Sequence, residues 1–178
     1  MIERGGILTL DLASQTGWAY APPSILRVWP RGVWRPGVVV PPVVSGTHRI
    51  APPKTAFGQF FAAFEDWLGD QIWLYRPDAV VFEAPLPHQS SQDAARRALG
   101  LVATTEKVCH QKGIRAVREQ ANNTVKKHFT GNGRAQKPDM LKACRDRGWN
   151  PTDDNEGDAQ ALLELAVRLL VHKEVLPS

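Results

Sequence analysis

The sequence predicts a single α/β domain with a mixed β-sheet flanked by helices. Its 178 residues are enough for one sizeable core, and 43% of them are hydrophobic, as in a globular protein. The N-terminal part has the pattern of a strand meander, and from about residue 55 helical and strand patterns alternate. Because we find no internal repeat, we expect one domain over residues 1–178.

The individual elements follow from the spacing of the apolar residues. Strands are expected at 6–12, 17–20, 43–50, 77–83 and 114–117, and helices at 55–74, 89–112, 121–128, 137–147 and 154–171. The stretch 130–133 should be a loop. Residues 22–53 hold eight of the fourteen prolines. Since proline lacks the donor that a central strand needs, most of this stretch should be loop or sheet edge.

Composition argues against several classes of protein. Cys109 and Cys144 lie far apart without a C-x-x-C pair, so we expect neither a zinc site nor a disulfide, and both fit as small helix residues. No apolar run approaches the roughly 20 residues that cross a bilayer, and the first residues lack a signal-peptide pattern. We therefore expect no membrane partner and a cytoplasmic location.

Positive charge is concentrated in one stretch of the chain. Residues 112–147 contain ten Lys or Arg and three acidic residues, a balance of +7, whereas the whole chain carries +4 and the rest therefore −3. Such a segment indicates a polyanionic partner, although a solvated helical surface would have the same composition.

Two apolar strands each end in a carboxylate. Asp11 follows Ile7–Leu10, and Glu83 follows Val80–Phe82. Either residue alone would usually be read as a loop or capping residue. Together with the acidic cluster Asp153–Asp158 they favour a metal site, because Mg²⁺ prefers oxygen ligands. Two such ions about 4 Å apart promote phosphodiester cleavage.

Helix geometry divides the acidic cluster into two groups. At 3.6 residues per turn, Asp154 and Asn155 lie on the same side as Asp158, while Asp153 and Glu156 point away from it. The Asp-x-x-Glu spacing resembles a capping box with Asp153 as the N-cap, so Asp153 and Glu156 should be structural. Asp158 is the better candidate ligand.

Four segments, in this order, resemble those of the RuvC-type Holliday junction resolvases: Asp11 with Ser14–Ala19; Val81–Glu83; Val125–Lys137, with the pattern V-K…G-x-G-x-A-x-K; and Asp158–Ala161, with the pattern D-A-x-A. The glycine–lysine segment is the most specific of the four. The likeness covers most of residues 6–20 and 78–171, and the Asp-Asp-Asn-Glu variant is most similar to phage-encoded members.

The resemblance implies a ribonuclease-H-like fold, a homodimer and paired nicks across a four-way DNA junction, in a bacterium or a phage-infected host cell. It implies four acidic ligands for two Mg²⁺ ions, which Mn²⁺ should be able to replace: Asp11, Glu83, one residue of the 154–155 pair, and Asp158. The family's third ligand commonly stands where this chain has Asn155. Because a carboxylate carries a full charge, we expect Asp154 to take that role.

Two further departures from the family pattern concern Leu86 and the proline-rich stretch. Leu86 stands where some relatives place an aromatic wedge, so the wedge here is either aliphatic or supplied elsewhere. The stretch 22–42 resembles an insertion without a counterpart in the family.

The basic segment gains a role from the same resemblance. The residues expected to contact DNA are Lys126, Lys127, Gly131, Gly133, Arg134 and Lys137. The glycines would let phosphate approach the backbone, and Lys137 would offset charge near the scissile phosphate, as a catalytic residue. Alternatively, Lys126 and Lys137 only hold backbone phosphates. The histidines His88, His110, His128 and His172 have no motif around them and are expected at the surface or in packing.

Subunit contact and function each leave alternatives open. The helix at 89–112 carries small apolar residues, which suit either a subunit interface or the core. The nuclease could act on forks or flaps instead of junctions. A ribonuclease-H-like module that binds DNA without cutting would have lost the acidic set, which is nearly intact here. A nucleotide-binding, kinase-like domain is disfavoured because no phosphate-binding glycine motif follows Asp11.

Overall fold

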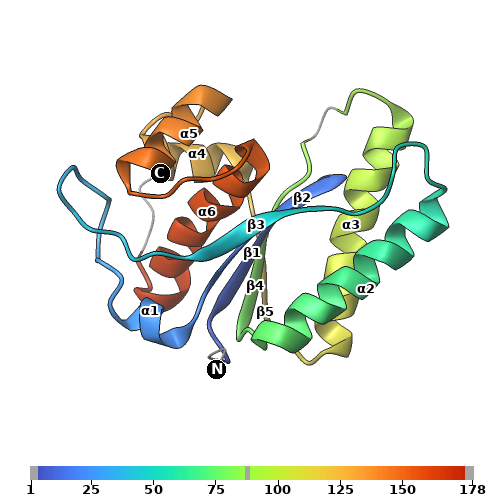
Figure 1. Cartoon of the computed structure of the whole chain (residues 1–178), viewed down its shortest axis with the longest axis horizontal. Coiled ribbons are helices and arrows are strands. Elements are labelled where there is room, and N and C mark those ends of the chain that lie inside the picture. Colours follow the sequence, from blue (N-terminus) through green and yellow to red (C-terminus); the bar gives the residue numbers. More distant parts are fainter. Residues whose placement is uncertain (1–3, 87–88, 175–178) are drawn as a thin grey trace.

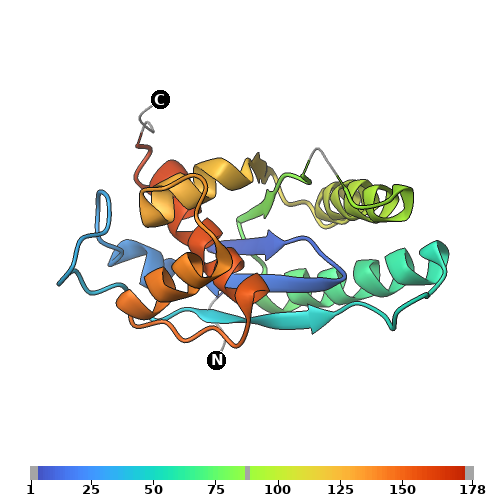
Figure 2. The same ribbon diagram turned by 90° about the horizontal axis from the view of Figure 1, so that it is seen from above.

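Strand β1 (Ile7–Asp11) lies at the centre of a five-stranded sheet in a computed structural model, which describes residues 4–86 and 89–174. It pairs in antiparallel fashion with β2 (Gln15–Ala21) and in parallel with β4 (Ala79–Glu83). The edges are β3 (Val44–Arg49), antiparallel to β2, and β5 (Ala116–Gln120), parallel to β4. The strand order is therefore β3-β2-β1-β4-β5, with β3 at the outer edge in Figure 2.

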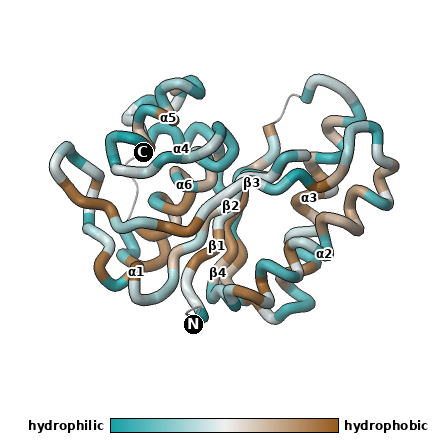
Figure 3. The backbone as a smooth tube through the Cα atoms, viewed as in Figure 1, coloured by the Kyte–Doolittle hydropathy of each residue, from teal (hydrophilic) through white to brown (hydrophobic). Residues whose placement is uncertain are grey.

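Helices cover both faces of this sheet (Figure 1). On one face lie α2 (Phe57–Tyr75) and α3 (Gln92–Gln111); on the other lie α4 (Asn122–Thr130), α5 (Lys137–Asp146) and α6 (Asp154–Ala166). Each face has its own hydrophobic core, and the brown strands in the middle of Figure 3 separate the two. The predicted α/β class with a mixed sheet is confirmed. Among the described residues, no helix is long and apolar enough to cross a membrane.

The alternation of side chains along the two central strands decides where the strand-end acids point. In β1, Leu8 and Leu10 pack toward α2 and α3, whereas Ile7 and Thr9 face α6. The hydroxyl of Thr9 donates to the carbonyl of Ala159 in α6 at 2.8 Å. Since side chains alternate with period two, Asp11 also faces α6, and the same argument applies to Glu83 in β4.

Helix α6 is buried along almost its whole length, because β1 and β2 cover one side and α4 and α5 the other. Its first turn approaches β2 closely at Gly17. A Cβ atom on Gly17 would lie 1.9 Å from the carbonyl oxygen of Asn155, so only glycine fits there. This contact sets the position of the first turn of α6 against β2, and with it the positions of Asp154, Asn155 and Asp158.

The predicted elements are all present, with boundary shifts that have local causes. The strand expected at 114–117 begins only at Ala116, because Gly113 takes a left-handed conformation and Ile114 caps α3 through the Cys109 carbonyl. The helix expected over 154–171 is α-helical only to Ala166 and continues as a π-helical turn, η1 (Val167–Val171). Both cysteines are buried helix residues, as expected.

The proline-rich stretch contains a short helix, α1 (Pro23–Arg27), which was not among the predicted elements. The prediction missed the use of proline in the first helical turn, where no N–H is needed. The rest of the stretch is irregular but anchored. Leu26, Trp29 and Val40 belong to the core on the α6 side, and the indole N–H of Trp149 donates to the Pro41 carbonyl at 3.1 Å.

Candidate active site

The two strand-end acids lie side by side at the carboxyl ends of parallel strands. Leu10 is paired with Phe82, so Asp11 and Glu83 come next in the same register. Helix α6 enters this edge of the sheet with Asp154 and Asp158, one turn apart. The four acids expected from the sequence thus come from three elements and line one cleft of about 540 Å³.

Burial and mutual repulsion disfavour the charged forms of three of these acids. Burial, and then the charges of Glu83, Asp158 and Asp154, raise the pKa of Asp11 well above its ordinary value. Burial raises the pKa of Glu83, which is 8% exposed, to about 7, and burial raises the pKa of Asp158 to about 6. Buried carboxylates that repel one another are a favourable place for a cation.

Two lysines reach the cleft from the opposite wall. The Nζ of Lys137, the first residue of α5, forms an ion pair with the Asp154 carboxylate. That contact lowers the pKa of Asp154 and raises the pKa of Lys137. Lys126 of α4 also lines the cleft, and its charge lowers the pKa values of Glu83 and Asp158 against the larger effect of burial. The site therefore combines acids with cations that could face a phosphate.

Asp153 and Glu156 have structural roles, as expected, but Glu156 has partners other than those of a capping box. Asp153 is the N-cap of α6 and accepts from the backbone N–H of Glu156 at 2.9 Å. The carboxylate of Glu156 instead accepts from the backbone and hydroxyl of Thr152 and from the hydroxyl of Ser45, each at 2.7 Å. The Ser45 contact ties the start of α6 to edge strand β3.

The structure separates the residues expected to bind DNA into two groups. Lys126 and Lys137 line the acidic cleft, whereas Lys127 and Gly131 line a second, larger cavity of about 1120 Å³ between α4 and α5. Gly131 ends α4 in a left-handed conformation, which by itself accounts for a glycine there. Gly133 and Arg134 lie in the turn that follows, where the Arg134 N–H donates to the Asn132 side chain at 3.0 Å.

The donors in the cleft fit a hard divalent ion, because they are carboxylate oxygens. As the side chains lie, however, no three His, Cys, Asp or Glu groups within 4–86 and 89–174 are close enough to share one ion. Asp154 is turned toward Lys137. Ion binding would therefore require side chains of the cleft to rotate, Asp154 among them, although all four acids already line it.

Sequence reasoning missed Asn122. Its side-chain amide donates to Glu83 Oε2 at 2.7 Å, which lowers the pKa of Glu83 against the larger effect of burial. Asn122 is the first residue of α4 and lies two residues after the end of β5. A polar residue that follows the strand next to β4 was the available signal, because the ends of neighbouring parallel strands meet at one sheet edge.

The histidines lie as expected where the structure describes them, and His88 is outside the described residues. His110 is exposed, whereas the side chains of His128 and His172 are buried. Leu86, the candidate for an aliphatic wedge if the wedge is not supplied elsewhere, is 58% exposed and lines the cleft.

Neither a protein-family profile nor a curated protein matches the chain in sequence. Solved structures do resemble it. The Thermus thermophilus RuvC structure superposes with a TM-score of 0.66 at 15% identity and covers 93% of this chain and 96% of its own. T. thermophilus RuvC in complex with a Holliday junction substrate gives 0.69 at 14% identity, covering 95% and 97%.

The chain has the ribonuclease-H-like fold of the RuvC-type resolvases. The yeast mitochondrial Holliday junction resolvase Ydc2 shares this fold, with a TM-score of 0.63 at 8% identity over 94% of this chain and 80% of its own. The match to RuvC extends over nearly the full length of both chains.

Proposed function

We propose that this protein is a metal-dependent, structure-specific DNA endonuclease that resolves four-way (Holliday) junctions by paired phosphodiester nicks. The observation that carries the proposal is the convergence of Asp11, Glu83, Asp154 and Asp158 in one cleft, with Lys126 and Lys137 on its wall. An acid set between lysines suits a phosphodiester, because it combines metal ligands with counter-charges for the phosphate oxygens.

The substrate class is supported by the proteins that share the fold. A RuvC of this fold was solved in complex with a Holliday junction substrate, and the yeast structure is that of a Holliday junction resolvase. Nicks on forks or flaps remain the second candidate. A module that binds DNA without cutting is disfavoured by the nearly intact set of acids in the cleft.

The four acids, the two lysines and Asn122 have roles in the proposed reaction. Asp11, Glu83, Asp158 and Asp154 would hold Mg²⁺, or Mn²⁺ in its place, with two ions per site. When bound, such ions supply an activated water and stabilise the leaving oxygen. Asn122 fixes the Glu83 carboxylate by its hydrogen bond. Lys137, once released from Asp154, would face the scissile phosphate, and Lys126 would hold a neighbouring phosphate.

The second cavity supports contacts to the DNA arms. Lys127 and Gly131 line it, and Arg134 lies in the adjoining turn, so these residues would hold backbone phosphates away from the site of cleavage. Such contacts confer affinity without sequence preference.

Two cuts at symmetric positions require two sites, so we include a homodimer in the proposal. Helix α3 offers Leu99, which is 62% exposed, beside smaller apolar residues. The core side of the same helix is formed by other residues, Leu101 and Val108 among them. Sedimentation of the free and DNA-bound protein tests the dimer, and a monomer in both would contradict it. A cytoplasmic location would follow from a DNA substrate.

The decisive experiment offers the purified protein synthetic four-way junctions, forks, flaps, duplex and single strands with Mg²⁺. The proposal predicts paired nicks at symmetric positions in the junction and little cleavage of duplex. Faster cleavage of forks or flaps would favour the second candidate. Binding of the junction without cleavage in Mg²⁺ or Mn²⁺ would reject the nuclease.

A further inference from the structure

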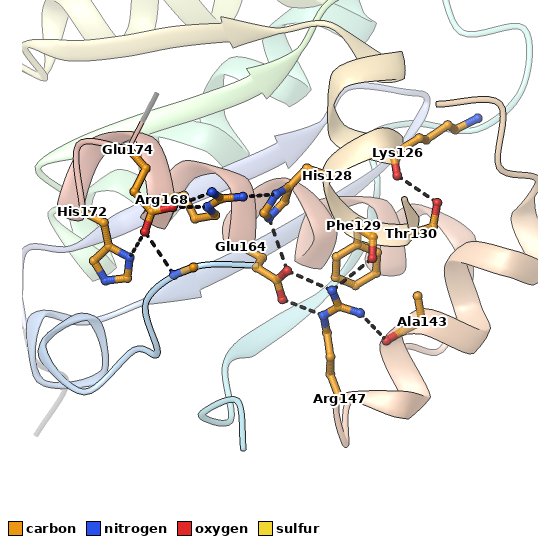
Figure 4. Close-up of polar contacts among 11 residues, drawn as sticks. Lys126, His128, Phe129, Thr130, Ala143, Arg147, Glu164, Arg168, His172 and Glu174 are labelled. Carbon is orange, nitrogen blue, oxygen red and sulfur yellow. Dashed lines mark hydrogen bonds and ion pairs between the residues drawn. The ribbon is translucent and has the colours of Figure 1, made fainter. Parts of the chain in front are cut away.

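A chain of ionisable side chains, buried except for Glu174, connects α4, α5, α6 and η1 on the side of the sheet that holds the acidic helix (Figure 4). Arg147 pairs with Glu164 through two hydrogen bonds, of 2.6 and 2.9 Å. Glu164 lies 3.3 Å from His128, and the other ring nitrogen of His128 lies 3.0 Å from Arg168. Arg168 in turn pairs with Glu174 at 2.7 Å. None of these residues lines the acidic cleft.

Arg147 binds three helices at once. Besides its two bonds to Glu164 in α6, its guanidinium donates to the carbonyl of Phe129 in α4 at 3.0 Å and to that of Ala143 in α5 at 3.1 Å. The last carbonyls of a helix have no partner within that helix, so Arg147 satisfies groups that would otherwise be buried without one. Its guanidinium also lies over the rings of Phe129, at 3.9 Å, and Trp34, at 4.5 Å.

His128 adds a second contact between α4 and α6. Arginine can only donate, so the Nδ1 atom that faces Arg168 accepts, which leaves the proton of a neutral ring on Nε2. That nitrogen points to Glu164 Oε1 at an ion-pair distance, although the geometry is not that of a hydrogen bond. Glu164 is thus shared between α5 and α4.

The Arg147–Glu164 pair lies beside the C-terminal ends of α4 and α5, the two helices that form the basic wall of the cleft. The cleft itself lies toward their N-terminal ends. Helix α4 begins at Asn122, which holds Glu83, and ends near Phe129, which Arg147 holds. Helix α5 begins at Lys137 and ends beside Arg147, about 15 Å away at 1.5 Å per residue. A small tilt about the held end therefore displaces the end that reaches the acids.

The geometry points to the Arg147–Glu164 pair as a positioning device for the active site: it sets α4 and α5 against α6, and so places Asn122, Lys126 and Lys137 against the four acids. The alternative is a purely stabilising role. Buried ion pairs contribute little net stability, because the cost of removing the two charges from water offsets their attraction. Well-packed apolar residues in their place often give the same stability. Removing the pair should therefore affect placement more than stability.

This positioning role rests on the proposed nuclease activity. Two variants of the Arg147–Glu164 pair test the positioning role. Arg147→Lys keeps the charge beside Glu164 but cannot reach the two carbonyls as a planar guanidinium does. Arg147→Met/Glu164→Leu removes both charges, so that neither is left buried alone. The matched control is Lys107→Gln/Glu65→Gln, which removes an exposed 2.8 Å pair between α2 and α3 on the opposite face.

We expect both variants to lower kcat for junction cleavage about tenfold to a hundredfold, a cost typical of small misplacements, with the junction Kd nearly unchanged. Lys137→Ala should lower kcat much less in either variant than in the wild type, because the placement of Lys137 is already lost there. The control should match the wild type. The positioning role would be overturned if folded variants kept the full kcat. It would also be overturned if Lys137→Ala lowered the kcat of the variants as much as that of the wild type.

Amide hydrogen exchange tests the device without cleavage. In both variants, amides at 122–126 and 137–141 should exchange faster, while those of β1 and β4 should not. Unchanged exchange in these two segments would reject the device even if the wild type cleaved nothing. A wild type that does not cleave, beside variants with faster exchange, would reject the proposed nuclease while the positioning of α4 and α5 stood.

Discussion

The amine of Lys137, at the start of α5, forms an ion pair with the carboxylate of Asp154, at the start of α6. The pair crosses the acidic cleft and joins the basic segment of the sequence to its acidic cluster. It holds the pKa of Asp154 below its ordinary value, while burial raises the pKa values of Asp11, Glu83 and Asp158. Asp154 therefore differs from the other three acids in having a lowered pKa and a lysine partner.

Asp154 rather than Asn155 is predicted to be the third metal ligand. Asp154→Asn should reduce cleavage by orders of magnitude, whereas Asn155→Ala should have a small effect, since an amide oxygen offers only a dipole to Mg²⁺. The cleavage rate of each variant across a Mg²⁺ titration decides between them. An inactive Asn155→Ala beside a fully active Asp154→Asn would mean that the amide takes the ligand position.

Metal-free protein is predicted to lose stability as the pH rises from about 4.5 to about 7. In this window the folded protein keeps a proton on Glu83, whose pKa is about 7 instead of 4.5, while the unfolded chain has released it. The shift corresponds to roughly 3 kcal/mol. Mg²⁺ should restore the lost stability at neutral pH, because it binds the folded state.

Thermal unfolding in EDTA and in Mg²⁺, for the wild type and Glu83→Gln, measures this effect. In EDTA, Glu83→Gln should become more stable than the wild type as the pH rises toward 7.5. In Mg²⁺, the wild type should be the more stable of the two. A Tm difference that does not change with pH would contradict the repulsive acid cluster.

Gly17 is predicted to tolerate no side chain. Gly17→Ala should lower the free energy of unfolding by about 1–3 kcal/mol, because the new Cβ would displace the first turn of α6 and Asp154 with it. Urea denaturation measures the change. Gly58→Ala in α2 is the control, since a Cβ placed there meets no atom within 4 Å apart from its chain neighbours and the backbone of its own helix. Equal stability of the two variants would argue against the close contact of α6 with β2.

Junction affinity is predicted to fall steeply with salt. Each phosphate contact contributes about −0.9 to the slope of log affinity against log salt on duplex arms, so Lys127→Ala and Arg134→Ala should each flatten it by up to about one unit. Lys107→Ala, on the opposite face, should leave the slope unchanged. An affinity that does not vary between low and physiological salt would argue against the basic segment as the DNA surface.

Much of the site could be predicted because it depends on local patterns. Asp11 and Glu83 end apolar strands, so period-two alternation and the parallel pairing of β1 with β4 bring them together. Asp153 was recognisable as an N-cap from its spacing to Glu156, and the structure confirms it. The family resemblance implied that Lys137 lies near the scissile phosphate, and in the structure its side chain reaches Asp154.

The rest depends on contacts between distant segments, which spacing does not show. Glu156 binds Ser45, 111 residues away, and Arg147 binds Glu164 and Phe129 on two other helices. The same applies to Asn122, whose partner lies on a neighbouring strand. Helix α1 was missed for a different reason, because the prolines around it were read only as breakers.

Metal-dependent cleavage by the acids of the cleft depends first on Asp11, the acid at the end of the central strand. The measurement is cleavage and binding of a synthetic four-way junction by the wild type and Asp11→Asn in Mg²⁺. We predict that the wild type makes paired nicks and that Asp11→Asn binds the junction at least as tightly but makes none, since a charge that repels phosphate is lost together with a ligand. Full cleavage by Asp11→Asn would contradict the account.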